Sequence, residues 1–278
     1  MAGDASTDVK GSGLAGSVGT LVGRRWLLLY FIQRQLSQSY RGSFLGVAWL
    51  VIGPLLMVAL YTLVFSEIIG LRFGEAESAS NYGLYIYSGL LPFFAFSETV
   101  NKSTNSIRQN AALVQRVVFP LEVLPLATAA TAFVTQLFGI AALSALLIFF
   151  EGELQWTLLL VPLIAIPQII FMTGLGLITT VAGAYVPDLR ELLAAVTRVM
   201  LFASPIIWPA SLAYDRGLGF IVDFNPIAVL VESYRDLALE GTLPDMAWLG
   251  GFTIFSVALL ILGAILFARA KKYFADVI

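Results

Sequence analysis

The chain has 278 residues, of which 59% are hydrophobic and only 12% charged, with a formal net charge of −2 and a mean hydropathy of +0.87. A soluble domain carries about 25% charged residues, so the composition predicts an integral membrane protein, and the net charge does not indicate nucleic-acid binding. The sequence contains no cysteine and no histidine, which excludes disulfides and removes the commonest metal ligand and general base.

The N-terminal residues 1–23 are rich in Gly, Ser, Ala and Thr and lack the apolar run of a signal peptide. We expect a disordered tail there and one transmembrane domain over residues 24–278.

An amphipathic helix is predicted at the start of that domain. Leu29 and Ile32 fall on one helical face, and Arg34 and Arg41 lie roughly opposite. This pattern is typical of a helix that lies in the inner membrane surface. Its arginines have two possible roles: they bind anionic lipid, or they also attract an anionic substrate headgroup or contact a partner.

The apolar runs that follow are long enough for transmembrane helices, each of which needs about 20 residues. Twelve of the sixteen Lys and Arg residues fall on one side of these runs and three on the other, with Arg198 inside a run near one end. Basic residues accumulate on the cytoplasmic side, so we place both termini there and regard Arg198 as an anchor rather than a substrate contact. The sequence thus predicts six spans, at residues 44–66, 82–102, 119–150, 156–186, 192–212 and 246–268.

The stretch "LVQRVVFPLEVLP" connects the second and third spans. Its two prolines break a helix, and Arg116 and Glu122 make it polar. We expect a short cytoplasmic element that docks a partner, in which Glu122 pairs with Arg116 or a neighbour. At the inner end of the second span, Glu98 and Lys102 are spaced for a helical ion pair.

The stretch "FNPIAVLVESYRDLALEGTLP" precedes the last span on the outer side. Asn225 and Pro226 predict a helix start, Gly241 predicts its end, and Glu232 can pair with Arg235. The apolar run here, residues 220–231, is interrupted by Asp223 and Pro226 and is too short to span the membrane, so we expect a re-entrant helical hairpin. It is either a surface loop or, as we favour from its length, an outer gate.

Aromatic residues concentrate in the first two spans. Trp49, Tyr61, Phe93 and Phe94 are candidates to line a pore, because aromatic faces stack on sugar rings. Membrane-interface belts offer the plainer explanation.

The sequence contains no phosphate-binding GxxxxGK[ST] motif, and it offers no catalytic or metal-binding centre. The chain is therefore predicted not to be an enzyme. If it transports a solute uphill, a partner must supply the energy.

Three stretches resemble motifs of type-2 ABC exporter permeases, in the same order: "YRGSFLGVAWLVIGPLLMVALYTLVFS", "NAALVQRVVFPLEVLP" and "NPIAVLVESYRDLALEG". The branch that exports lipid-linked polysaccharides such as O antigen is the most similar. This resemblance implies a bacterial inner-membrane homodimer bound to two copies of a separate ATPase. ATP and Mg would bind that ATPase, and this chain would hold no cofactor.

The resemblance also implies roles for particular residues. A coupling helix for the ATPase would lie in residues 105–116. The stretch "VVFPLEVLP" that follows would be its rigid exit, and the two prolines of that stretch would make a stiff joint that tilts the third span. The pore would lie between two copies, lined by the first and fifth spans. The residues concerned are Arg108, Gln115, Arg116 and Glu122 for coupling, Arg34 and Arg41 for a lipid pyrophosphate at the inner entrance, and Asn225, Pro226, Glu232 and Arg235 for the outer gate.

Other functions stay open at this point. The same fold serves drug, small-molecule and lipid exporters. A membrane enzyme acting on polyprenyl-phosphate sugars would need clustered acidic residues, whereas those here are scattered. A membrane scaffold without transport is the remaining alternative.

Overall fold

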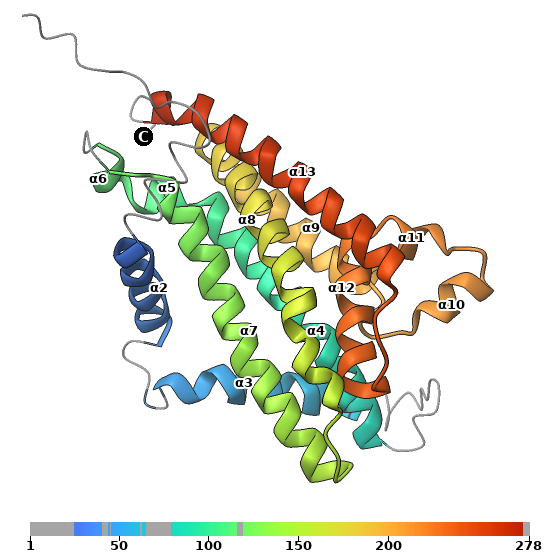
Figure 1. Cartoon of the computed structure of the whole chain (residues 1–278). Helices are drawn as coiled ribbons and strands as arrows, with labels where there is room; N and C mark the ends of the chain where they lie inside the picture. Colours follow the sequence, from blue (N-terminus) through green and yellow to red (C-terminus); the bar gives the residue numbers. More distant parts are fainter. Residues whose placement is uncertain are drawn as a thin grey trace, which may run out of the picture.

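The computed structural model describes residues 25–40, 44, 46–61, 63–64, 79–115 and 119–274, and every regular element within these ranges is helical (Figure 1). The expected tail over residues 1–23 and the arginines Arg41 and Arg116 lie outside the described residues. The all-α fold class is therefore confirmed for the described part of the chain.

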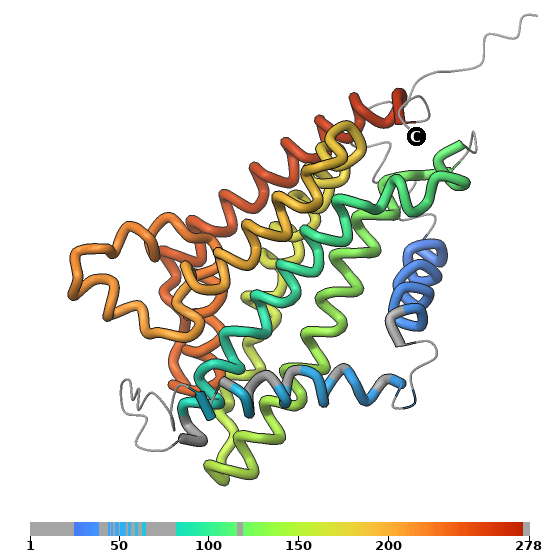
Figure 2. The backbone as a smooth tube through the Cα atoms, turned by 180° about the vertical axis from the view of Figure 1, so that it is seen from behind, coloured from blue at the N-terminus to red at the C-terminus, as the bar shows by residue number. Residues whose placement is uncertain are grey.

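Four long helices form the body of the molecule and lie side by side in both views (Figures 1 and 2). Within the described residues, three segments are long and apolar enough to cross a membrane, and they match the third, fourth and sixth predicted spans. The fourth long helix has 26 residues, about 39 Å at 1.5 Å per residue, so it has the length expected of the second span. The four helices are α4 (Ala79–Thr104), α7 (Val123–Phe150), α8 (Val161–Tyr185, preceded by η3, Trp156–Leu160) and α13 (Met246–Ala270).

Each end of this body carries shorter helices. At one end, α4 and α8 finish, α7 begins, and α5 (Ser106–Gln109) and α6 (Ala111–Val114) follow α4. At the other end, α7 finishes and η3 begins beside α12 (Pro226–Arg235) and η4 (Asp236–Glu240). We refer to them as the α5 end and the α12 end.

The predicted fifth span is interrupted. Helix α9 (Leu189–Ala203) has 15 residues and stops at Ser204, whose backbone is extended with φ −92° and ψ 151°. Pro205 explains the stop, because a residue that precedes proline is disfavoured in the helical region. The helix of the predicted span 192–212 therefore ends at residue 203, and α10 (Ala210–Asp215) and α11 (Phe220–Asp223) follow as separate short helices.

Helix α2 (Arg25–Tyr40) confirms the expected N-terminal helix but not its orientation. It runs beside α7 in Figures 1 and 2 instead of across the bundle. Phe31 is only 4% exposed and packs among residues of α5 and α7, whereas Leu29 on the predicted apolar face is 63% exposed. Protein packing around Phe31 therefore decides which face of α2 turns inward.

Helix α3 (Trp49–Tyr61) covers only part of the first predicted span. It has 13 residues and crosses α4 and α7 (Figure 1). Its Leu56 and Leu60 are both exposed, so one apolar face of α3 has no protein partner within the described chain.

Glycines let the long helices approach one another closely. A Cβ on Gly263 of α13 would lie 2.5 Å from the carbonyl oxygen of Gly174 on α8, and a Cβ on Gly183 of α8 would meet the backbone of Thr104 at the end of α4. Small residues at helix contacts let backbones pack closely inside membranes. The relative placement of α4, α8 and α13 thus depends on these glycines.

We expect Gly263→Ala to lower the thermal stability of the purified protein, because the added methyl meets backbone atoms that cannot move aside. Overpacking of this kind costs about 1–3 kcal/mol. Gly250→Ala is the matched control on the same helix, since a Cβ there meets nothing within 4 Å. Thermal unfolding in detergent measures both variants, and equal melting temperatures would contradict this account of the α8–α13 contact.

A polar network joins three elements inside the body. The Tyr234 hydroxyl donates to Gln168 Oε1 at 2.7 Å, and Gln168 Nε2 donates to Gln136 Oε1 at 2.6 Å. All three side chains are buried. Buried polar groups need such partners, so the network fixes the position of α12 against α7 and α8.

Candidate functional site

The expected coupling segment forms two single turns of helix at the α5 end. Helices α5 and α6 are separated at Asn110, whose φ of −116° and ψ of 30° are not helical. The continuous helix expected over residues 105–116 is thus broken at Asn110. Arg108 and Gln115 are both exposed at this end of the molecule, as contact with a partner requires.

The coupling segment is fastened to the end of α8. Arg108 Nη2 donates to the carbonyl oxygen of Ala184 at 3.2 Å, and the hydroxyls of Ser106 and Thr180 lie 3.2 Å apart. Ile107 is 1% exposed and anchors the turn in the core. A force on α5 would therefore reach α8 directly.

An ion pair joins the start of α7 to the end of α13. Lys271 Nζ lies 2.6 Å from a carboxylate oxygen of Glu122. Glu122 was expected to pair with Arg116 or a neighbour. Its partner in the structure is Lys271, which is close in space but distant in sequence. The sequence predicted only that both residues lie on the cytoplasmic side of the membrane. It did not identify them as partners.

The end of the described chain packs beside this ion pair. Phe274 is fully buried and its ring lies 5.5 Å from that of Phe267 and 6.3 Å from that of Tyr185. The Lys271 region is thus part of the packed α5 end.

At the α12 end, the caps of α12 are confirmed. Asn225 accepts a hydrogen bond from the amide of Ile227 at 3.0 Å, and Pro226 occupies the first turn. The Asn225 amide also donates to Ser204 Oγ at 2.8 Å, so the start of α12 meets the end of α9. Gly241 ends η4 with φ 65°, the left-handed conformation that glycine adopts without strain.

Arg235 lies at the centre of this region and is 1% exposed. Its expected ion pair with Glu232 is confirmed at 3.0 Å. Sequence reasoning missed that its guanidinium also donates to the carbonyl oxygens of Pro205, Ile206 and Tyr85 and lies 3.5 Å from the centroid of the Tyr85 ring. One buried cation thus joins α4, α12 and the chain after α9.

Two details show how this cation is accommodated. A Cβ on Gly89 would lie 2.9 Å from Arg235 Nη2, so glycine there leaves room for the guanidinium. Acidic side chains of α12 and η4 lie close together beside it. Burial, with Glu240 and Glu232 nearby, raises the pKa of Asp236 to about 7, which lessens the repulsion among these carboxyl groups near neutral pH.

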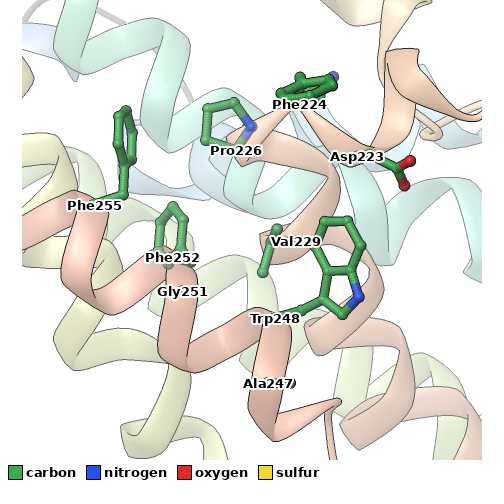
Figure 3. A pocket seen from close by; sticks show the side chains of 10 residues that line it. Asp223, Phe224, Pro226, Val229, Ala247, Trp248, Gly251, Phe252 and Phe255 are labelled. Atoms are coloured by element: carbon green, nitrogen blue, oxygen red, sulfur yellow. The ribbon is translucent and has the colours of Figure 1, made fainter.

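A hollow of about 570 Å³ separates the turn before α12 from α13 (Figure 3). Phe224 is 87% exposed beside it, and the rings of Trp248, Phe252 and Phe255 line the α13 side. The turn that begins α12 therefore has little packing against α13 on this side.

The candidate pore aromatics are not brought together. Phe93 is 3% exposed and contacts the rings of Phe94 and Phe96, so it belongs to the core. Phe94 and Trp49 are partly exposed on different helices. The side chain of Tyr61 lies outside the described residues.

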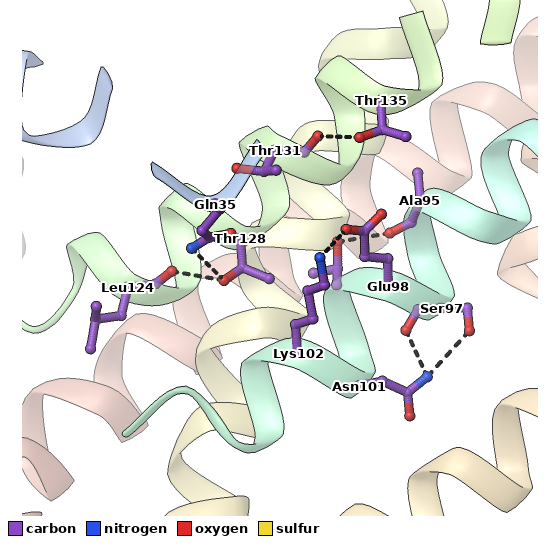
Figure 4. Close-up of polar contacts among 11 residues, drawn as sticks. Gln35, Ala95, Ser97, Glu98, Asn101, Lys102, Leu124, Thr128, Thr131 and Thr135 are labelled. Atoms are coloured by element: carbon purple, nitrogen blue, oxygen red, sulfur yellow. Dashed lines mark hydrogen bonds and ion pairs between the residues drawn. The ribbon is translucent and has the colours of Figure 1, made fainter. Parts of the chain in front are cut away.

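The candidate entrance residue Arg34 lies on α2 with its guanidinium carbon 5.6 Å from the Phe31 ring centroid. The expected Glu98–Lys102 pair is confirmed at 2.6 Å (Figure 4). Arg198 is exposed on α9 and donates to the carbonyl oxygen of Ala194, four residues earlier.

These features define a multi-pass helical membrane protein that carries short helices at both ends of its body. Residues 27–239 match the family model described as "ABC-2 type transporter". The chain belongs to this family and is a membrane permease domain.

Characterised relatives cover almost the whole chain. It is 28% identical over 253 residues to the O-antigen export system permease protein RfbA of Myxococcus xanthus, covering 91% of this chain and 95% of that protein. RfbA of Klebsiella pneumoniae is 26% identical over 254 residues, with the same coverage of 91% and 95%. The polysialic acid transport protein KpsM of Escherichia coli is 25% identical over 242 residues, covering 82% and 87%.

Proposed function

We propose that this chain is the permease subunit of an ATP-driven exporter that moves a lipid-linked polysaccharide, O antigen or a related surface glycan, across the cytoplasmic membrane. The observation that carries the proposal is the near full-length similarity to permeases named for O-antigen and polysialic acid transport. The family implies a partner ATPase, and two copies of it would bind a dimer of this chain.

The α5 end is proposed as the cytoplasmic end. It carries Lys102, Arg108, Lys271 and Lys272, as the preference of basic residues for the cytoplasmic side predicts. The coupling segment would there contact the ATPase through Arg108, Gln115 and Arg116. Glu122 would lie in the connection between this segment and α7. Both termini would lie on this side.

The pore is proposed to lie between two copies of the chain. Helices α3 and α9 both expose apolar faces, and on α9 this face holds Leu192, Val196, Val199 and Phe202. A second copy would cover part of these faces and complete the channel. The helix break at Ser204 and the segment from Asn225 to Arg235 would form its outer gate.

Deletion of the gene in its host tests the proposal. We expect loss of the surface polysaccharide, accumulation of lipid-linked glycan inside the cell, and restoration by a plasmid copy. Extraction in mild detergent should also recover an ABC-type ATPase in equal amount with the tagged permease. Normal surface glycan in the deletion strain would refute polysaccharide export and favour a small-molecule exporter of the same fold.

A further inference from the structure

Two neighbouring hollows lie between α12 and the start of α13, and their walls differ in chemistry. The larger, of about 570 Å³, is the apolar hollow of Figure 3, and the smaller has a volume of about 210 Å³. Val229 and Trp248 line both hollows, so the two adjoin. The larger alone falls within the range of roughly 300–1,000 Å³ that is typical of ligand pockets.

The wall of the larger hollow is suited to hydrocarbon. Phe252 and Phe255 project from α13 toward Phe224 and Pro226 of the turn that begins α12 (Figure 3). Phe224 is 87% exposed and Phe255 is 47% exposed, so the protein itself does not cover these rings. Between them Gly251 has no side chain, and a Cβ there would meet nothing within 4 Å. An apolar occupant would remove this surface from water, which is favourable.

The hollow continues into the membrane-facing surface of α13. This helix is long and apolar enough to cross a membrane. Gly251, Phe255 and Leu262 are spaced by four and seven residues and so share one helical face, and both large side chains of this face are exposed. An apolar track therefore runs from the hollow along α13. The faces proposed for contact with a second copy lie on other helices, α3 and α9, which leaves this track to the bilayer.

The smaller hollow is acidic. Glu232, Asp236 and Asp245 line it, and Asp223 lines the adjoining larger hollow. Among the described residues, no lysine or arginine lines either hollow. Glu232 is paired with the buried Arg235, whereas Asp236 forms no ion pair within the described part of the chain. The excess of carboxylates disfavours an anionic headgroup here and favours a cationic one.

We propose that the two hollows bind a lipid with an amine-bearing headgroup, an aminophospholipid such as phosphatidylethanolamine, from the membrane leaflet at the α12 end. One acyl chain would lie in the larger hollow along Phe252 and Phe255, and the ammonium would lie in the smaller hollow beside Asp236. Trp248 would contact both parts, because an indole ring packs against hydrocarbon and attracts a cation to its face. The inference requires only that the chain spans a membrane and is independent of the exported solute.

The bound lipid would support the turn that begins α12. This turn has little packing of its own against α13, and the acyl chain would fill the space between Phe224 and Phe252. A ligand that binds only the folded state stabilises that state. Phosphatidylethanolamine should therefore raise the melting temperature of the purified permease in detergent.

Native mass spectrometry of the purified permease in detergent tests the larger hollow. Gly251→Leu places a side chain in the hollow without a clash and should weaken binding of phosphatidylethanolamine about tenfold. Gly250→Leu is the matched control, because a Cβ there also meets nothing within 4 Å but the residue does not line the hollow. Equal binding by the two variants would overturn the proposal.

Three lipids with identical acyl chains test the smaller hollow: phosphatidylethanolamine, its N-acetylated form without the positive charge, and phosphatidylglycerol. The wild-type chain should bind the first about tenfold more tightly than the other two. Asp236→Asn should reduce this preference several-fold. Glu240→Gln, which removes a neighbouring carboxylate outside both linings, is the control and should keep the preference. Equal binding of all three lipids by the wild-type chain would overturn the amine-binding assignment.

The same spectra separate a lipid from a second copy of the chain as the occupant. Loss of dimer in Gly251→Leu, with dimer retained in Gly250→Leu, would overturn the proposal and identify the hollow as an interface between copies. The expected result is an unchanged dimer with less bound lipid and no gain in melting temperature on addition of phosphatidylethanolamine. Because these measurements do not involve transport, their failure leaves the proposed export function standing.

Discussion

Replacing Arg235 with methionine is expected to destabilise the protein strongly and to loosen its α12 end. The change leaves the carbonyl oxygens of Tyr85, Pro205 and Ile206 without their donor and the Glu232 carboxylate without its partner. A buried acceptor left without a donor costs about 1–3 kcal/mol, whereas the Glu232 side chain is 36% exposed and can be solvated after the change. We therefore expect a clear fall in melting temperature in detergent.

Arg235→Lys separates charge from geometry. A lysine keeps the positive charge but has no planar fork that can donate to several carbonyl oxygens at once, so we expect an intermediate melting temperature. Arg216→Met is the control, because Arg216 is exposed near the same end of the molecule. A wild-type melting temperature for Arg235→Met would show that the buried guanidinium does not hold α4, α12 and the chain after α9 together.

The same variants test the gate. In proteoliposomes that contain the resting permease, Arg235→Met should raise ion leakage, because α12 loses its hydrogen bonds to Pro205 and Ile206 in the chain after α9. Arg216→Met should not. Leakage equal to wild type in a folded Arg235 variant would favour the interpretation of this region as a plain surface loop.

Only some of the contacts of Arg235 could be predicted from the sequence. The spacing of Glu232 and Arg235 predicted their ion pair, since helical neighbours need only local geometry. Its burial depended on the stop of α9 at Ser204 and on the space left by Gly89. Both features belong to the tertiary structure and involve distant parts of the chain, so they cannot be predicted from the periodicity of apolar residues.

The same distinction holds for the rest of the fold. The helices α4, α7, α8 and α13 were predicted because a bilayer requires long apolar runs, and the caps of α12 were predicted because capping is local. The orientation of α2 was not predicted, because it depends on how Phe31 packs into a core formed by other helices. The burial of Phe93 was not predicted for a similar reason, since aromatic residues fill cores and line surfaces equally well.

A second large effect is expected from breaking the ion pair between Glu122 and Lys271. Lys271→Glu should place two carboxylates where an ion pair stood at 2.6 Å, and we expect export of surface glycan to fall several-fold. ATP hydrolysis by the assembled complex should fall less than export, because the catalytic site lies in the partner. Lys272→Glu, an exposed neighbour with no ion pair among the described residues, is the control.

Charge exchange shows whether the contact itself matters. The double variant Glu122→Lys with Lys271→Glu restores opposite charges and should recover most of the lost export. Recovery would mean that the start of α7 and the end of α13 must stay joined while the ATPase acts. Failure to recover, with normal folding and dimer formation, would contradict a direct role of the pair.

The contacts at the α5 end suggest how a movement of the ATPase would be transmitted to the long helices. The proline-containing connection between α6 and α7, with Pro120 and Pro125, would transmit a push from α5 to α7 alone. Arg108 and Ser106 also fasten the segment to α8, and Glu122 fastens the elbow to α13. The three helices would then tilt as one unit against α9 and the α12 end, so a change that cuts the link to α13 should impair export while leaving ATPase binding intact.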